Sequence, residues 1–150
     1  MSKQVQDAYI VAATRTPIGK SHKGYLRNMR PGDLLATTMK AVLAQAPGLD
    51  PQAIEDVVCG CAIPEAQQGL NVARISAVLA GLPVGVGGVT VNRFCASGLT
   101  ALQMAADRIR VGEADVMIAA GVESMSMVPM MGNSPSLSPS IFEREGDVGI

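Results

Sequence analysis

The sequence predicts an α/β fold in which a mostly parallel β-sheet is covered by helices on both faces. Short apolar segments alternate along the chain with longer segments whose apolar residues recur at helical spacing. The short segments are continuously apolar and lack the alternation of a half-exposed strand, which is typical of parallel strands buried on both faces. Hydrophobic residues make up 48% of the 150 residues, which is enough for the core of one ordinary domain.

The first elements are a strand, a loop and a helix. Residues 8–13, "AYIVAA", form a continuous apolar run bounded by polar residues and are predicted to be a buried strand. Residues 14–32 are rich in glycine, proline and charge and are predicted to be a loop. Pro31 suits the first turn of the next helix, Asp33 suits its positive N-terminus, and Gly48 is expected to end it. Its core-facing stripe is expected to consist of Leu34, Leu35, Met39, Val42 and Leu43.

A second strand and a second helix follow. Pro51 is expected to start a short helical turn, and the apolar run at 56–62 predicts a buried strand. Asn71 is expected to cap the next helix, which Gly81 and Pro83 stop. The core-facing stripe of that helix is expected to consist of Val72, Ile75, Val78, Leu79 and Leu82.

The remaining sequence predicts a strand–helix–strand unit and then changes character. A strand is expected at 88–94, a helix at 96–112 and another strand at 115–121. The inner face of this helix is expected to consist of Leu99, Leu102, Ala106 and Ile109. Residues 122–150 are rich in methionine, serine and proline and show no clear period. We therefore expect an α/β domain at 1–121 and the start of a second, lid-like loop domain at 122–150.

Composition and charge exclude several classes of function. The net charge is −1, the sequence pI is about 5.8 and no basic cluster stands out, so neither a nucleic acid nor an anionic membrane is an expected partner. Only 3% of the residues are aromatic, which leaves no stacking platform for single strands. The longest apolar run, residues 78–89, is interrupted by Pro83 and is too short to span a bilayer.

Three cysteines, an odd number without a disulfide framework, predict a reducing, cytoplasmic location. Cys59 and Cys61 are one residue apart in a predicted strand, so both are expected to be buried on the same face. The chain's one histidine, His22, is distant in sequence. Because these spacings are unusual for zinc, no metal site is expected.

The third cysteine, Cys95, lies in "NRFCASG" (92–98), between a predicted strand and the start of a helix. Ligands of parallel sheets bind at the carboxyl ends of strands, and a helix N-terminus favours an anionic thiolate. The small residues that follow would let a bulky substrate approach, and a backbone N–H of this turn could stabilise an oxyanion. The residues themselves leave two interpretations open: a nucleophile, or a small apolar residue buried at a turn.

Three blocks of the sequence, in order, resemble the thiolase family. They are "VAATRTPIGK" (11–20), "GLNVARISAVLAGLP" (69–83) and "VNRFCASGLTALQMAADRIRVGEADVMIAAGVESMS" (91–126). The resemblance runs from about residue 8 to 150. The chain looks most like the degradative 3-ketoacyl-CoA thiolases of fatty-acid β-oxidation, since it has Ala96 where biosynthetic relatives more often have glycine.

The resemblance implies that Cys95 is the catalytic nucleophile that carries the acyl group as a thioester, with its backbone N–H as an oxyanion donor. It implies cleavage of a 3-ketoacyl-CoA by CoA into acetyl-CoA and a shortened acyl-CoA, or the reverse Claisen condensation. Coenzyme A would then be a co-substrate, with no covalently bound cofactor. It also implies a homodimer or tetramer and a five-layer αβαβα sandwich, of which this chain would supply the first half.

The family's activating histidine, second catalytic cysteine and oxyanion-hole asparagine lie in G-H-P, C-x-G and N-E-A-F motifs. None of these motifs occurs in this sequence. We therefore expect the N-terminal portion of a thiolase, inactive alone, whose exposed apolar face is normally covered by a C-terminal half. His22 is expected to be a solvated loop residue, Glu123 to have a structural role, and Arg93 to make a salt bridge or an interface contact rather than act on Cys95.

Other functions remain open at this point. The first is an acetoacetyl-CoA (biosynthetic) thiolase or a 3-ketoacyl synthase of the same superfamily, which condenses acyl groups. The second is a non-catalytic lipid-binding or interaction module, which the missing motifs favour.

Overall fold

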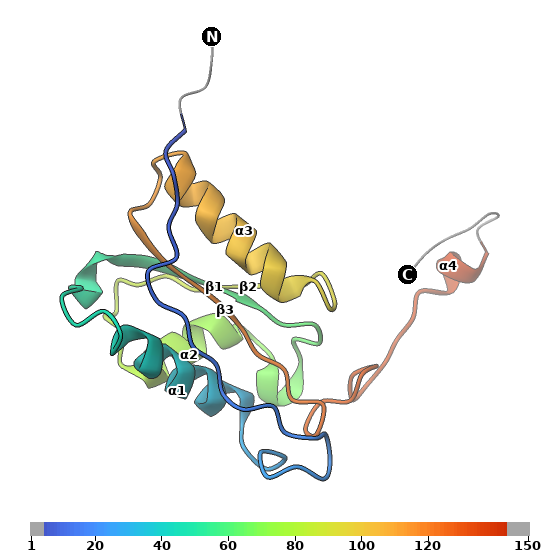
Figure 1. Cartoon of the computed structure of the whole chain (residues 1–150). Coiled ribbons are helices and arrows are strands. Elements are labelled where there is room, and N and C mark those ends of the chain that lie inside the picture. Colours follow the sequence, from blue (N-terminus) through green and yellow to red (C-terminus); the bar gives the residue numbers. More distant parts are fainter. Residues whose placement is uncertain (1–4, 144–150) are drawn as a thin grey trace.

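The computed structural model describes residues 5–143 and confirms the predicted α/β class. Three parallel strands form a sheet in the order β2-β1-β3, so β1 pairs with both other strands. Helices α1 and α2 cover one face of this sheet and α3 covers the other (Figure 1). The strands are β1 (Ile54–Gly60), β2 (Val89–Val91) and β3 (Val116–Gly121). The helices are α1 (Pro31–Leu43), α2 (Val72–Ala80), α3 (Ser97–Arg110) and the short α4 (Pro139–Phe142), with 3₁₀ turns η1 (Pro51–Ala53) and η2 (Ala66–Gln68).

The main core lies between the sheet and the pair α1 and α2. Successive side chains of β1 point to opposite faces, so Val57 and Cys59 face this core while Val58 faces α3. From α1, Leu35 and Met39 are buried in the same core, in agreement with the predicted stripe of this helix. The cluster under α3 is smaller, and its buried members are Val58, Ala101 and Ala105.

Local signals set three helix ends as the sequence predicts, whereas α1 ends at Leu43 and not at the expected Gly48. Pro31 begins α1, and the side chain of Asn71 accepts a hydrogen bond from the backbone N–H of Arg74 at 3.3 Å at the start of α2. Gly81 ends α2 in the left-handed conformation, with φ of 82°. This conformation is one that glycine adopts without steric cost.

The predicted inner face of α3 is wrong. The buried residues of this helix are Ser97, Ala101 and Ala105. In contrast, Leu99 is 71% exposed and Leu102 is 39% exposed. Small side chains let the helix lie close to the sheet, and the larger apolar side chains consequently face away from it.

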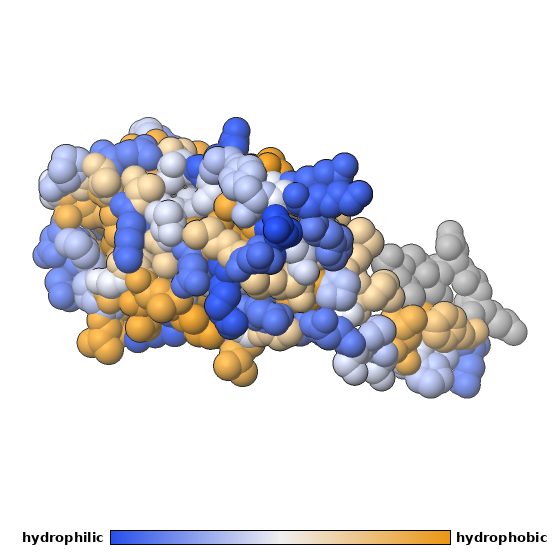
Figure 2. Space-filling view, turned by 90° about the horizontal axis from the view of Figure 1, so that it is seen from below, coloured by the Kyte–Doolittle hydropathy of each residue, from blue (hydrophilic) through white to orange (hydrophobic). Residues whose placement is uncertain are grey.

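The predicted stripe of α2 is confirmed only at Val72, which is buried, and at Leu82, which packs against the core. The buried residues of α2 are Val72, Ala73, Ser76 and Ala77. Three members of the expected stripe, Ile75, Val78 and Leu79, are exposed. Figure 2, which views the molecule from below Figure 1, shows such apolar surface interspersed with polar residues.

The predicted strand at 8–13 is also wrong, because the structure has no strand there. Tyr9, Ile10 and Val11 are 77%, 73% and 85% exposed. An apolar run indicates a tendency to be buried, but a strand also needs a partner, and no strand within residues 5–143 pairs with this segment.

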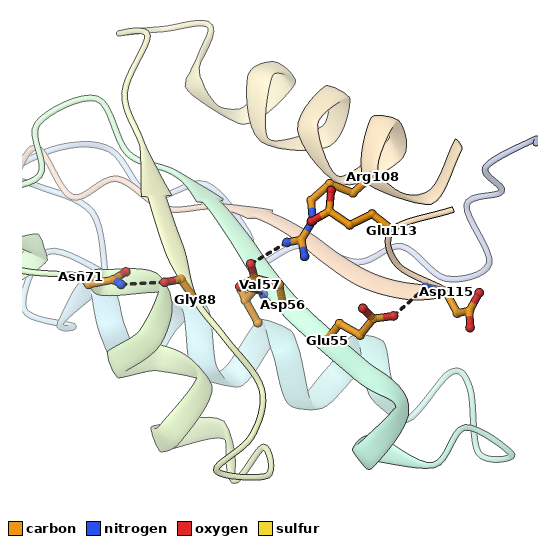
Figure 3. Close-up of polar contacts among 8 residues, drawn as sticks. All are labelled: Glu55, Asp56, Val57, Asn71, Gly88, Arg108, Glu113 and Asp115. Atoms are coloured by element: carbon orange, nitrogen blue, oxygen red, sulfur yellow. Dashed lines mark hydrogen bonds and ion pairs between the residues drawn. The ribbon is translucent and has the colours of Figure 1, made fainter. Parts of the chain in front are cut away.

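A cluster of charged side chains lies at the amino end of β1 (Figure 3). The guanidinium of Arg108 is 2.7 Å from a carboxylate oxygen of Asp56 and 2.9 Å from one of Glu113. Glu55 accepts a hydrogen bond from the backbone N–H of Asp115 at 2.7 Å. These contacts fasten the last turns of α3 and the chain entering β3 to the central strand.

Beyond β3 the chain first packs against the α/β body and then leaves it. Ser124 and Val128 are buried, whereas α4 lies away from the body (Figure 1). The domain boundary after residue 121 stays a prediction, and residues 144–150 of the expected second domain lie outside the described residues. Within the described part of the chain, no helix is both long enough and apolar enough to cross a membrane.

Candidate active site

The turn between β2 and α3 carries Cys95. Strand β2 ends at Val91, earlier than predicted, and α3 begins at Ser97. The thiol of Cys95 is exposed, so the interpretation as a buried apolar residue is wrong. The preceding residue, Phe94, has φ of 48°, which places a bulky side chain in the left-handed region.

Hydrogen bonds on both sides of Cys95 define this turn. The backbone N–H of Phe94 donates to the side-chain oxygen of Asn92 at 2.8 Å. The backbone N–H of Arg93 donates to the Ser97 hydroxyl oxygen at 2.8 Å, and this hydroxyl donates to the Phe94 carbonyl at 2.6 Å. The backbone N–H groups of Ala96 and Ser97 donate to the carbonyls of Arg93 and Phe94, each at 3.0 Å.

Glycines at the carboxyl ends of β1 and β3 let this turn approach the sheet. Gly60 pairs in register with Val91 and Gly121. A Cβ at Gly60 would overlap the carbonyl carbon of Ser97 and lie 2.5 Å from the backbone nitrogen of Gly98. The start of α3 therefore rests directly on the backbone of the central strand, as the sequence analysis did not anticipate. The signal for it is a glycine inside an apolar strand, which indicates close backbone approach.

Backbone N–H groups near Cys95 are free to bind an anion. Within residues 5–143, the N–H groups of Cys95, Gly98 and Leu99 donate to no protein acceptor. They lie at the positive end of α3, where the helix dipole favours a thiolate or an oxyanion. An exposed thiol beside such donors can attack a carbonyl carbon and stabilise the oxyanion that forms.

The other two cysteines are unsuited to this chemistry. Both are buried, as predicted. Burial, with repulsion from Cys61 and Glu123, raises the pKa of Cys59 to about 12. Burial and the Glu123 carboxylate raise the pKa of Cys61 to about 12 as well. At neutral pH both remain neutral thiols, which are poor nucleophiles.

Glu123 ties the segment after β3 to the segment after β1, which agrees with the structural role expected for it. Its carboxylate accepts a hydrogen bond from the backbone N–H of Ala62 at 2.7 Å and another from the side-chain amide of Gln68. Gln68 is fully buried and also accepts a hydrogen bond from the backbone N–H of Ser124 at 3.0 Å. No periodic pattern or motif in the sequence indicated this role for Gln68.

Arg93 and His22 take no visible part in the chemistry. The guanidinium of Arg93 makes no ion pair with the carboxylates that the structure describes, so the salt bridge expected for it is absent there. His22 is exposed, and its backbone N–H donates to the Ser126 hydroxyl at 2.9 Å. Among the described residues, no imidazole or carboxylate hydrogen-bonds to the thiol of Cys95.

Two cavities within residues 5–143 lie away from Cys95. One cavity of about 440 Å³ lies beside Val5 and Arg110, and one of about 110 Å³ lies between Thr16, Thr38 and Glu123. Neither includes Cys95, whose thiol lies on open surface. The described chain thus places an exposed cysteine and free backbone N–H groups together at the start of α3.

Comparisons with known proteins agree with this arrangement. Residues 8–146 match the family "Thiolase, N-terminal domain". The 3-ketoacyl-CoA thiolase of Bacillus subtilis (strain 168) is 50% identical over 140 residues, which are 93% of this chain and 36% of that protein. The 3-ketoacyl-CoA thiolase of Aeromonas hydrophila is 44% identical over 149 residues, which are 97% of this chain and 38% of that protein.

A solved structure shows the same fold. The crystal structure of the Bacillus anthracis acetyl-CoA acetyltransferase matches 99% of this chain and 36% of its own, with a TM-score of 0.77 and 31% sequence identity. The chain thus spans little more than a third of the length of these relatives. The resemblance found in the sequence is confirmed: the chain belongs to the thiolase family and carries its N-terminal domain.

Proposed function

We propose that this chain is the nucleophile-bearing portion of a 3-ketoacyl-CoA thiolase, an acyltransferase that cleaves 3-ketoacyl-CoA with CoA. The observation that carries the proposal is the exposed thiol of Cys95 beside free N–H groups at the start of α3. The identities of 44–50% to relatives named 3-ketoacyl-CoA thiolase support the choice of substrate class. The acetyl-CoA acetyltransferase, at 31% identity, supports the biosynthetic alternative less strongly.

The proposed reaction has two halves. The Cys95 thiolate attacks the 3-keto carbon, and the resulting oxyanion accepts a hydrogen bond from the Cys95 N–H. When the oxyanion collapses, the bond between carbons 2 and 3 breaks, and acetyl-CoA leaves as an enolate that takes a proton at carbon 2. The shortened acyl group remains on Cys95 as a thioester. The thiolate of a second CoA then attacks this carbonyl, and Cys95 leaves as a thiolate.

A thioester suits this exchange because reactant, intermediate and product are all thioesters of similar energy. No intermediate is then much more stable than the reactants or the products, and the reaction can run in either direction. Proton transfer to the enolate and activation of the two thiols require groups that the described chain does not place at Cys95. We therefore expect this chain alone to be inactive and a C-terminal half to supply them.

The exposed apolar side of α3 fits the same proposal. Leu99 and Leu102 face away from the sheet, so α3 has apolar residues on both sides, as a helix between two layers would. A second thiolase half would cover this side, with CoA as co-substrate and a homodimer or tetramer as the assembly. Participation in fatty-acid β-oxidation and a cytoplasmic location remain predictions. The competing function, a non-catalytic module that binds another protein or a lipid, rests on the same exposed surface.

Acyl transfer to Cys95 distinguishes these functions. The protein at its natural length would be incubated with a 3-ketoacyl-CoA and then digested with trypsin. Cleavage after Arg93 and Arg108 releases residues 94–108, which contain Cys95 and no other cysteine. We expect this peptide to gain the mass of the shortened acyl group, and added CoA to release it as acyl-CoA. A Cys95→Ala variant that still released acetyl-CoA at the wild-type rate would refute the proposal.

A further inference from the structure

The hydroxyl of Ser97 occupies an unusual position for the first residue of a helix. A serine at a helix start commonly accepts a hydrogen bond from an N–H of the first turn. The start of α3 has no such side-chain cap. The Ser97 hydroxyl instead bonds backward, as acceptor from Arg93 N–H and as donor to the Phe94 carbonyl. Its contacts therefore support the turn before Cys95 and not the helix after it.

Phe94 needs such support. Its φ of 48° is a conformation that non-glycine residues rarely keep unless the surrounding structure imposes it. Packing does not impose it, because Phe94 is 59% exposed. Two side chains contact its backbone, Asn92 at the N–H and Ser97 at the carbonyl. Of the two, Ser97 is buried and lies beyond Cys95 in the chain, so its bonds close the turn around the nucleophile.

Ser97 is itself held firmly. It is 3% exposed, and its carbonyl carbon lies against the backbone of Gly60. Because Ser97 is buried against the central strand, its hydroxyl is held in a position from which it can bond to residues 93 and 94. Because Cys95 lies between these residues and Ser97, the orientation of its thiol and its N–H follows from this closed loop.

We propose that Ser97 is a positioning residue for the nucleophile. Its hydroxyl holds Phe94 in the left-handed conformation and so presents the thiol and the N–H of Cys95 together at the start of α3. This inference rests on the proposed function, in which Cys95 is the reacting thiol. Under this inference, Ser97 orients the nucleophile. A serine that was only buried, or that only capped the helix, would have no such role.

Alkylation of Cys95 tests the inference. The second-order rate constant with iodoacetamide would be followed at neutral pH through the tryptic peptide 94–108. We expect Ser97→Ala to slow this reaction about tenfold, which is the rate equivalent of one net hydrogen bond. Ser76→Ala is the matched control, since Ser76 is equally buried but lies in α2, and its hydroxyl has no partner among the described residues. The control should alkylate at the wild-type rate.

A second background keeps the test valid if Ser97→Ala folds poorly. Glycine adopts positive φ without strain, so Phe94→Gly removes the need for the hydroxyl to hold the turn. We expect the loss caused by Ser97→Ala to fall from about tenfold to about twofold in the Phe94→Gly background, the non-additivity of coupled sites. A residue that matters only for folding would cause the same loss in both backgrounds.

The outcomes separate the two proposals. If wild-type Cys95 reacts fast and Ser97→Ala reacts equally fast, or if the loss is equal in both backgrounds, the positioning role is refuted and the proposed function stands. If Cys95 in the wild-type protein at its natural length reacts no faster than a cysteine in an unfolded peptide, the activated nucleophile itself is refuted, and the role of Ser97 falls with it.

Discussion

The two ends of the central strand differ in how their polar groups are satisfied. At the amino end, Arg108 pairs with both Asp56 and Glu113, and Glu55 accepts a hydrogen bond from a backbone N–H. At the carboxyl end, N–H groups beside Cys95 have no acceptor in the described chain, and Phe94 is held at positive φ. At the amino end, where the charged groups are paired, these contacts hold α3 against β1. At the unsatisfied end, the proposed function would use the free N–H groups to bind a substrate oxyanion, at a cost in stability that the rest of the fold offsets.

The largest effect is expected from filling the space at the carboxyl end. In Gly60→Ala, the new Cβ would overlap backbone atoms of Ser97, which cannot move aside as a flexible side chain could. We expect the free energy of unfolding to fall by about 3 kcal/mol, the upper range for overpacking a core, and alkylation of Cys95 to slow at least tenfold. Urea denaturation and the alkylation assay measure the two effects.

Gly48→Ala is the control for that substitution. A Cβ at Gly48 would meet nothing within 4 Å among the described residues, and its φ is not positive. This variant should keep wild-type stability and reactivity. If Gly60→Ala behaved like Gly48→Ala, the close approach of α3 to β1 would be wrong.

A smaller effect is expected at the amino end, and it should leave the nucleophile alone. Arg108→Ala leaves the carboxylate of Asp56 unpaired, with a side chain that is only 19% exposed. We expect a loss of about 2 kcal/mol in the free energy of unfolding, since a partly buried charge loses its hydrogen-bonded partner. The rate of Cys95 alkylation should stay at the wild-type value, because the pair lies at the other end of the strand.

The exposed pair formed by Arg110 and Asp107 supplies the comparison for Arg108. These side chains are about half exposed, and their atoms are 3.3 Å apart. Arg110→Ala should cost no more than about 0.5 kcal/mol. An equal loss for Arg108 and Arg110 would show that burial adds nothing to the amino-end cluster.

The signals that predicted the fold correctly are local. Pro31, Asn71 and Gly81 set helix ends through their own backbone and side-chain geometry, so the sequence suffices to place them. The inner faces of α2 and α3 were predicted wrongly because both helices have apolar residues on more than one side. The larger side chains fitted the expected stripe, yet the smaller ones allow the close approach to the sheet.

The candidate site shows the same division. The place of Cys95 between a strand and a helix is a local pattern that made it a candidate nucleophile, and the resemblance to the thiolases then favoured this interpretation over a buried apolar residue. The roles of Gly60 and Ser97 depend on a contact between segments 37 residues apart in the chain. A glycine inside an apolar strand signals a close backbone approach, but it does not specify which segment approaches. The run at 8–13 was predicted as a strand from composition alone, and composition does not supply a pairing partner.

The buried thiols of Cys59, in β1, and Cys61, just after it, predict that the free energy of unfolding depends on pH. The pKa of Cys59 is raised to about 12 from an ordinary value of 9.0, so above pH 9 the unfolded chain loses a proton that the folded chain keeps. The free energy of unfolding should therefore be constant below pH 9 and fall above it, by at most about 1.4 kcal/mol per pH unit for each such thiol. Urea denaturation of the wild type and of Cys59→Ala at pH 8, 9 and 10 measures this slope. A slope that is the same in both proteins would contradict the buried, neutral thiol.

The smallest effect concerns two of the buried serines, Ser76 and Ser97, whose hydroxyl groups differ in whether they have a hydrogen-bond partner. Ser97 makes two hydrogen bonds at the site, whereas the Ser76 hydroxyl in α2 is buried with no partner among the described residues. A buried hydroxyl without a partner opposes folding, and alanine has the higher helix propensity. We expect Ser76→Ala to raise the free energy of unfolding by about 0.5 kcal/mol, whereas Ser97→Ala should lower it by about 1 kcal/mol. Thermal denaturation of both variants checks the opposite signs. If both variants lost the same free energy of unfolding, the Ser76 hydroxyl would have a hydrogen-bond partner after all. Hydrogen bonding would then not distinguish Ser76 in α2 from Ser97 in α3.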